Sequence, residues 1–146
     1  MQFLWTSLLS IVLLSSIHWE TDFAKAKQSA KTEHKLILLN FSGSDWCGPC
    51  IRMHKEIFES KSFTQYAGDH LVLVNADFPR LKKHQLPDDQ LKRNNQLAEA
   101  YNKEGDFPFT LLLTEEGIVL KTWHGLPKVS PEAFVEEIKE ASHANK

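Results

Sequence analysis

The sequence predicts an α/β domain whose central mixed sheet is flanked by helices, and three observations support this class. Two apolar runs, residues 35–41 and 71–77, have the composition of strands buried on both faces. Residues 51–58, which lie between them, have the spacing of an amphipathic helix, so the three segments form a strand–helix–strand unit with parallel pairing. Residues 110–114 and 118–123 flank a short glycine-containing turn and are predicted to pair as a hairpin.

Three more helices complete the predicted order. Residues 19–32 carry apolar side chains at three-to-four spacing, with Thr21 as the expected N-cap. Residues 90–102 form the next helix, which Gly105 is expected to close. The Ser-Pro-Glu sequence at residues 130–132 is a typical helix start. The chain therefore reads helix, strand, helix, strand, helix, strand, strand, helix.

Length and charge limit the possible classes. A chain of 146 residues is long enough for one domain with a proper core, preceded by a leader. The formal net charge of −2 gives no support to a general nucleic-acid-binding role. The 42% apolar fraction and the four tryptophans fit a compact fold.

The first residues resemble an export signal. Residues 3–17 are apolar and uncharged, which is short for a membrane span and suitable for the core of a signal peptide. No Lys or Arg precedes the run, and the small-residue pattern at Ala24 and Ala26 lies inside the first predicted helix. We expect residues 1–17 to be a signal peptide or an uncleaved N-terminal anchor, and residues 18–146 to be the domain. A buried first element is the alternative.

The two cysteines of the chain, Cys47 and Cys50, lie between the first predicted strand and the helix that follows it. Residues at positions i and i+3 of a helix have Cβ atoms about 5–6 Å apart, and a small adjustment brings them to disulfide distance. Cys47 would lie at the helix N-terminus, where free N–H groups stabilise a thiolate. Pro49 suits the first helical turn, and Gly48 leaves room for a partner disulfide to approach. The spacing therefore predicts a redox-active pair.

Two other roles for the pair stay open. A purely structural disulfide is one, although so small a ring stabilises a fold only weakly. A zinc site is the other, but it needs about four ligands, and only His54 lies near enough in sequence to join the cysteines. We expect neither a metal ion nor a cofactor.

The segment Trp46-Cys47-Gly48-Pro49-Cys50, combined with Phe107-Pro108 before a later strand, resembles the active site of thioredoxin. The resemblance covers residues 19–142. Further segments, at 41–47, 75–80 and 86–87, are similar to exported bacterial thioredoxin-like proteins, in particular to periplasmic thiol–disulfide oxidoreductases of the DsbH type. The fold class is therefore expected to be thioredoxin-like.

This resemblance implies a role for each matching residue. Cys47 matches the attacking thiolate, and Cys50 matches the thiol that resolves the mixed disulfide. Trp46 matches the aromatic residue beside the site, and Pro108 matches a cis-proline that faces the cysteines. Phe107 would offer backbone hydrogen bonds to an extended substrate segment. An ordinary trans peptide leading into an edge strand is the alternative for Phe107-Pro108.

The chain departs from the thioredoxin pattern at a buried acid–lysine pair. Asn40 occupies the position of the aspartate that passes protons to the resolving thiol, and the position of the lysine falls at Leu73 or one residue away. An amide cannot exchange a proton near neutral pH as a carboxylate does. Either water performs this step, or Asp45 does so from the surface.

The resemblance implies a thiol–disulfide oxidoreductase that acts on protein disulfides in the periplasm, soluble or N-terminally anchored. The Gly-Pro pair between the cysteines favours a reductase, which needs an electron donor at the membrane. An oxidase, an isomerase or a redox-inactive binding module of the same fold is the alternative. We expect a monomer that binds no nucleic acid. The basic segment at residues 79–93 is either a site for an acidic partner or a solvated insertion.

Overall fold

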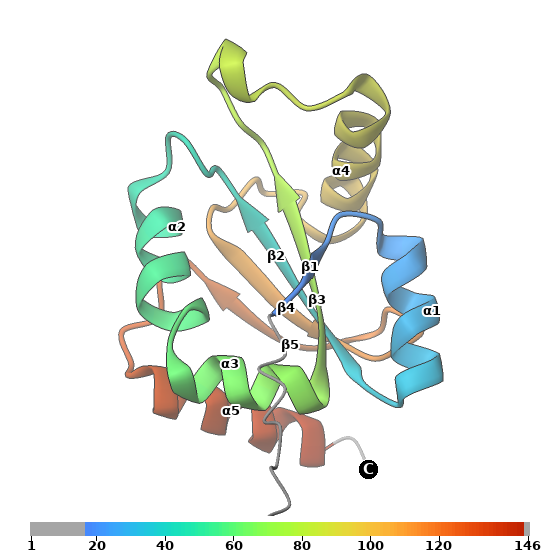
Figure 1. Ribbon diagram of the computed structural model, residues 1–146, viewed down its shortest axis with the longest axis vertical. Coiled ribbons are helices and arrows are strands. Elements are labelled where there is room, and N and C mark those ends of the chain that lie inside the picture. Colours follow the sequence, from blue (N-terminus) through green and yellow to red (C-terminus); the bar gives the residue numbers. More distant parts are fainter. Residues whose placement is uncertain (1–16, 145–146) are drawn as a thin grey trace, which may run out of the picture.

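The computed structural model describes residues 17–144, so the predicted signal peptide or anchor lies outside the described residues except for Ile17. The core is a five-stranded sheet in the order β1-β3-β2-β4-β5 (Figure 1). Strands β1, β3 and β2 are parallel, while β4 and β5 are antiparallel to their neighbours. The strands are β1 (Trp19–Glu20), β2 (Leu36–Ser42), β3 (Leu71–Asp77), β4 (Phe109–Leu113) and β5 (Val119–His124). The predicted mixed sheet is confirmed.

Helices cover both faces of this sheet (Figure 1). One apolar cluster joins one face to α2, α3 and α5, and a second joins the other face to α1 and α4. Neighbouring residues of β2 point alternately into the two clusters, as the period of a strand requires: Leu38 into the first, and Ile37 and Leu39 into the second. The helices are α1 (Phe23–Glu33), α2 (Gly48–Met53), α3 (Lys61–His70), α4 (Asp88–Tyr101) and α5 (Pro131–His143), with a π-helical turn η1 (His54–Phe58) and a 3-10 turn η2 (Lys82–His84). Within residues 17–144, no helix is both long enough and apolar enough to span a membrane.

The start of the chain differs from the prediction. Trp19 belongs to the short strand β1, which pairs with β3, and its ring packs on Phe58 with centroids 5.0 Å apart. Helix α1 begins later than predicted, and its N-cap is Asp22, not Thr21, because the Asp22 carboxylate accepts the backbone N–H of Ala24 at 3.0 Å. A strand of two residues is too short to show an alternating pattern, so its apolar side chain looked like part of the helix that follows.

The helix after the cysteines also differs. It runs from α2 into the π-helical turn η1, which ends at Phe58 with Glu59 as its C-cap. Ser60 then caps a separate helix, α3. The Ser60 hydroxyl accepts the N–H of Phe63 at 3.3 Å. The sequence pattern predicts no separate helix over residues 61–70. Neither glycine nor proline marks this break, because the wider η1 turn and the serine cap produce it.

The remaining elements follow the predicted pattern closely. Strand β3 has the predicted bounds, and the helix start at Ser130 is confirmed by its hydroxyl, which accepts the N–H of Ala133 at 3.1 Å. Helix α4 ends at Tyr101 with Asn102 as its C-cap, so Gly105 lies in the following turn and does not close the helix. The fold thus places the loop after β2 and the loop before β4 at one end of the sheet.

Candidate active site

The cysteine pair lies where the sheet ends. Phe41 of β2 pairs with Phe109 of β4 in antiparallel register, so the loop that follows Ser42 and the peptide that precedes Phe109 leave the sheet at the same edge. At this end of the sheet, Cys47 and Cys50 follow β2, and Pro108 directly precedes β4. Sheet register therefore brings together segments that lie about sixty positions apart in sequence.

The two cysteines form a disulfide, with Cα atoms 5.2 Å apart. Cys47 is the N-cap of α2, and its sulfur accepts the backbone N–H of Cys50 at 3.2 Å. Pro49 occupies the first turn, as predicted. When the bond is reduced, the same N–H and the positive end of the helix stabilise a thiolate on Cys47. Of the two sulfurs, the one on Cys47 is thus positioned at the start of the helix with a backbone N–H directed at it.

Trp46 is held from several sides beside this disulfide. Its indole N–H donates to the carbonyl of Phe78 at 2.7 Å, and the Arg80 guanidinium lies 3.6 Å from the ring centroid. The edge of Phe107 contacts the same indole, with centroids 5.4 Å apart. A Cβ on Gly43 would lie 2.7 Å from the indole nitrogen and closer still to the ring carbons. Glycine at position 43 thus makes room for a fixed tryptophan.

The peptide between Phe107 and Pro108 is cis, as the resemblance implied. Phe107 packs against Trp46 and also against Phe78, with ring centroids 5.6 Å apart in the second pair. The carbonyl of Pro108 accepts the N–H of Gly125 at 2.9 Å, and Gly125 has a φ of 72°. Trp46, Phe107 and Pro108 therefore form one connected wall at the sheet edge, together with Phe78, which the sequence analysis did not single out.

Asn40 is part of a neutral, buried hydrogen-bond network. Its amide group donates to the side-chain oxygen of Asn75 at 3.2 Å, and its own oxygen accepts the hydroxyl of Thr110 at 3.0 Å. Asn40 is 6% exposed and Thr110 is fully buried. Leu73, at the position of the expected lysine, belongs to the apolar core. The acid–lysine pair of the thioredoxin pattern is thus replaced by amide and hydroxyl groups with satisfied hydrogen bonds.

The carboxylate of Asp45 is occupied by other contacts. It accepts the backbone N–H groups of Arg80 at 2.9 Å and Leu81 at 3.0 Å, and its second oxygen lies 3.0 Å from Nδ1 of His84. The hydrogen bond from Arg80, followed by those from Leu81 and His84, lowers the pKa of Asp45 below its ordinary value. A carboxyl group with a lowered pKa is a poor proton carrier near neutral pH. These contacts argue against the predicted proton-handling role of Asp45 and make it the anchor of a loop.

A hollow of about 310 Å³ opens beside Cys50. Both polar and apolar side chains line it, and they include the network residues Asn40 and Asn75. His54 lies on its wall and pairs with Glu59 at 3.2 Å, with 55% of its side chain exposed. The hollow places open space next to Cys50. The sequence predicted neither this space nor a place for Asn75 beside Cys50.

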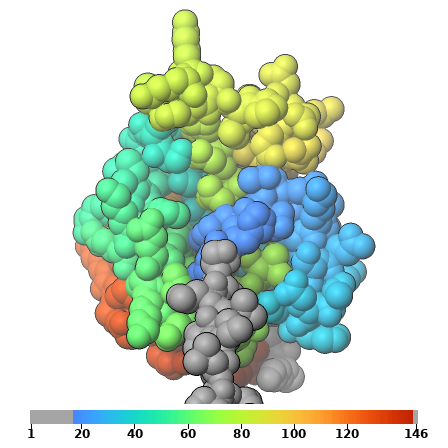
Figure 2. All heavy atoms as spheres, viewed as in Figure 1, coloured from blue at the N-terminus to red at the C-terminus, as the bar shows by residue number. Residues whose placement is uncertain are grey.

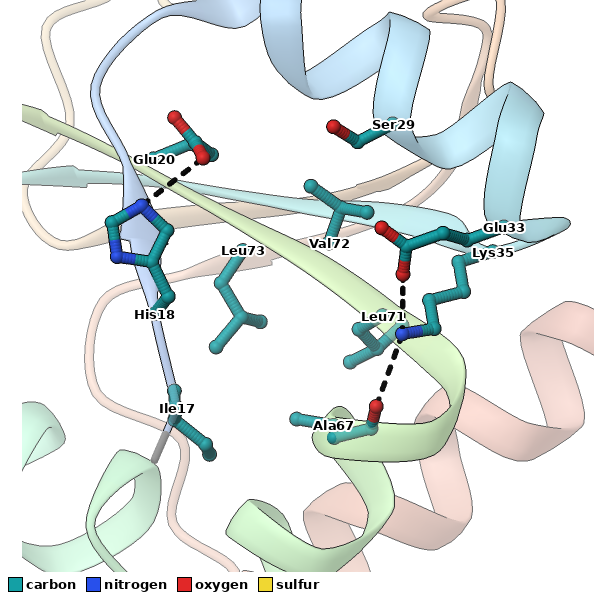
Figure 3. A pocket seen from close by; sticks show the side chains of 11 residues that line it. Ile17, His18, Glu20, Ser29, Glu33, Lys35, Ala67, Leu71, Val72 and Leu73 are labelled. Carbon is teal, nitrogen blue, oxygen red and sulfur yellow. Dashed lines mark hydrogen bonds and ion pairs between the residues drawn. The ribbon is translucent and has the colours of Figure 1, made fainter. Parts of the chain in front are cut away.

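A second hollow, of about 180 Å³, lies at the opposite end of the sheet (Figure 3). Its wall includes Leu71, where β3 begins, while the cysteines lie beyond the end of β2, which runs parallel to β3. Lys35 spans part of the wall, pairing with Glu33 at 2.6 Å and donating to the carbonyl of Gly68 at 3.1 Å. This hollow is therefore separate from the redox site.

No cluster suited to a metal ion occurs in the described part of the chain, where no three His, Cys, Asp or Glu side chains gather. His124, near the wall of the site, is 64% exposed and pairs with Asp106 at 2.7 Å. The chemistry that the site offers is that of its disulfide.

Comparisons with known proteins agree with this geometry. A sequence model of a family described as thioredoxin-like matches residues 18–114. The disulfide bond reductase DsbH of Chlamydia pneumoniae is 37% identical over 130 residues, which cover 89% of this chain and 75% of DsbH. The thioredoxin-related protein DsbJ of the same organism is 32% identical over 101 residues, which cover 69% of this chain but only 28% of DsbJ.

Solved structures are similar over most of the chain. A DsbH oxidoreductase matches with a TM-score of 0.78 at 36% identity, covering 87% of this chain and 85% of that one. A thioredoxin from Thermus thermophilus matches with a TM-score of 0.65 at 14% identity, covering 87% of this chain and 88% of that one, which shows the fold alone. The predicted thioredoxin-like fold is confirmed.

Proposed function

Since the chain belongs to the thioredoxin-like family and is a thiol–disulfide oxidoreductase similar to DsbH, we propose that it reduces protein disulfides in an exported, periplasmic compartment. The observation that carries the proposal is the Cys47–Cys50 disulfide at the start of α2, in which Cys47 accepts the N–H of Cys50. This contact prepares one sulfur of the pair to act as a thiolate.

The cycle begins with the reduced pair. The Cys47 thiolate attacks one sulfur of a substrate disulfide, so that a Cys47–substrate disulfide forms and the other substrate sulfur leaves as a thiolate. Cys50 then loses its proton and attacks Cys47. The second substrate thiolate leaves, and the Cys47–Cys50 disulfide forms. Two electrons pass from the cysteine pair to the substrate.

Trp46, Phe107 and Pro108 form the proposed substrate-binding wall. Trp46 and Phe107 pack edge to face, and the cis peptide lies at the sheet edge from which the cysteine loop also departs. An extended substrate segment that lies along this edge would place its disulfide next to Cys47. The apolar rings would exclude water from the bond between Cys47 and the substrate, whereas Cys50 borders the hollow on its other side.

Water takes up the proton of Cys50 in this proposal. Asp45 is engaged by the backbone of Arg80 and Leu81, and Asn40 cannot accept a proton near neutral pH. The hollow beside Cys50 offers room for water molecules that several polar groups could hold. Water is therefore the better supported of the two routes that the sequence left open.

Two facts support the proposal that the protein reduces substrate disulfides and does not oxidise substrate thiols. The Gly48-Pro49 pair matches thioredoxin, whose reduction potential of about −270 mV is at the reducing end of the family. The similar protein DsbH is named a disulfide bond reductase. Because the bacterial periplasm is kept oxidising, a reductase there needs an electron donor at the membrane. The apolar run at residues 3–17 supports export, and the intact mass of the native protein will show whether it is cleaved.

The reduction potential of the Cys47–Cys50 couple tests whether electrons pass from the protein to its substrates or from the substrates to the protein. Equilibration with glutathione should give a value near that of thioredoxin. A potential above about −150 mV, close to that of the oxidant DsbA, would refute the reductase proposal and favour an oxidase.

Trapping of partners tests whether the pair acts on proteins at all. A Cys50→Ser variant purified from its native host should carry substrate proteins linked to Cys47, because the resolving thiol is missing. The matched Cys47→Ser variant should carry almost none. Equal and negligible trapping by both variants would favour a redox-inactive binding module. Sedimentation of the untrapped protein should show a monomer.

A further inference from the structure

The segment after β3 carries a cluster of positive charge near the site. We call residues 80–84 the basic loop; Arg80, Lys82 and Lys83 lie in it, and no acidic residue occurs between positions 79 and 87. All five residues of the loop are exposed, including Leu81 with 46% of its surface accessible. Figure 2 shows this loop, in yellow-green, projecting beyond the rest of the face in view. Charge and an apolar side chain are thus presented together.

The basic loop is fixed to the active-site loop and is not a loose insertion. Asp45, two positions before Cys47, holds the N–H groups of Arg80 and Leu81 and the ring of His84. Its side chain is only 6% exposed, which shows how closely the loop covers it. The 3-10 turn η2 at Lys82–His84 gives the loop a regular backbone. The cysteine segment and the basic loop therefore form one unit.

Arg80 brings positive charge to the edge of the site itself. Its guanidinium lies 3.6 Å from the centroid of the Trp46 ring, and Trp46 directly precedes Cys47. The indole is in turn fixed by its hydrogen bond to Phe78. A guanidinium that stacks on an aromatic ring keeps its N–H groups at its edge, where they can bind a carboxylate in a bidentate manner.

These positive charges have no acidic partner of their own. Among residues 17–144, no ion pair involves Arg80, Lys82 or Lys83. The Asp45 carboxylate is already occupied by three donors, and Asp89, which follows the loop, pairs with Arg93 at 3.0 Å. The charge of the basic loop is available to a binding partner.

We propose that the basic loop binds an acidic segment of the protein that exchanges disulfides with Cys47, with carboxylates next to the partner's cysteine. The inference rests on the proposed function and adds to it the class of partner. Both an oxidised substrate and a reduced electron donor could carry such a segment. Exposed ion pairs add little to affinity, but a cluster of charge of one sign raises association rates by about 10- to 1,000-fold at low salt. The loop should therefore act mainly on the rate of encounter.

Paired peptides test the proposal with the whole protein. One peptide has a disulfide flanked by glutamates, and the other has glutamines in the same positions. In the first arm, the reduced protein is mixed with each disulfide peptide; in the second arm, the oxidised protein is mixed with each dithiol peptide. Second-order rate constants are measured at about 0.01 M and about 1 M salt, between which the screening length falls from about 30 Å to about 3 Å.

We expect the acidic peptide to react about tenfold faster at low salt, and the difference to vanish at high salt. The Lys82→Gln/Lys83→Gln variant should lose most of this advantage. The control variant Lys25→Gln/Lys31→Gln removes two exposed charges on α1 instead and should keep it. If the acidic peptide is preferred only as a disulfide, in the first arm, the acidic partner is an oxidised substrate. If it is preferred only as a dithiol, in the second arm, the acidic partner is the electron donor.

Equal rates for the two peptides in both arms, at both salt concentrations, would overturn the inference and leave the proposed function intact. If both double-lysine variants lose the same share of the rate advantage, the inference is also overturned, because the net charge of the whole protein, and not the basic loop, would then explain the preference. If the reduced protein reacts with neither peptide, the proposed reductase activity fails, and the second arm still reports on charge preference.

Discussion

Replacing Gly43 by Ala should displace Trp46 and destabilise the protein by about 1.5–4.5 kcal/mol. The added Cβ would lie 2.7 Å from the indole nitrogen, so the ring must move. Movement breaks the hydrogen bond to Phe78, the contact with Arg80 and the edge-to-face pair with Phe107. Each of these contacts contributes about 0.5–1.5 kcal/mol.

Urea unfolding followed by far-ultraviolet circular dichroism measures the loss, since this signal does not depend on the indole that moves. Tryptophan fluorescence of the folded state should change as well, because the surroundings of Trp46 change. Gly68→Ala is the matched control, since it lies in α3 with no atom within 4 Å of the added Cβ. This control should stabilise the protein by about 0.5–1 kcal/mol. If Gly43→Ala has the same effect as Gly68→Ala, Trp46 is not fixed as described.

Three further changes test other contacts. Thr110→Val removes the buried hydroxyl that donates to Asn40 and should cost about 1–3 kcal/mol in urea unfolding; no loss would show that the network is unimportant. Because the pKa of Asp45 is lowered from 3.8, its stabilising effect should be present above that pH and be lost as the pH falls towards the folded pKa. The amide signal of Arg80 in NMR should shift over this acidic range, and should not do so in Asp45→Asn. Ser130→Ala should cost about 0.5–2 kcal/mol through loss of a helix cap, measured by thermal unfolding.

Sequence reasoning succeeded where the signal is local. Residues 71–74 are all apolar and lead into Asn75-Ala76-Asp77, and a strand with the predicted bounds is present. The serine and proline at the start of α5 have positional preferences that depend only on the helix itself. The cysteine pair and the cis peptide before Phe109 followed from the thioredoxin pattern, which is a short motif.

The contacts that sequence reasoning missed depend on the path of the chain. Asp45 and the backbone of Arg80 are 35 positions apart, and the strand β3 lies between them. Nothing local distinguishes a loop acid that binds a distant backbone from one in solvent. The stacking of Arg80 on Trp46 has the same origin, since it requires the loop after β3 to fold back over the loop after β2. Such contacts follow from topology and register.

Asn40 suits its buried position because burying a neutral amide there costs less than burying a carboxylate. A buried carboxylate at position 40 would have to lose its hydration, which is costly without a partner of opposite charge, and the partner position holds Leu73. The amide of Asn40 is satisfied by Asn75 and Thr110 at no such cost. A neutral network therefore stabilises the core but leaves the proton of Cys50 without a fixed acceptor. Cys50 lines a hollow, so in the proposed mechanism the resolving step uses water held there, whereas the proposed attack by Cys47 uses the backbone N–H at the start of its own helix.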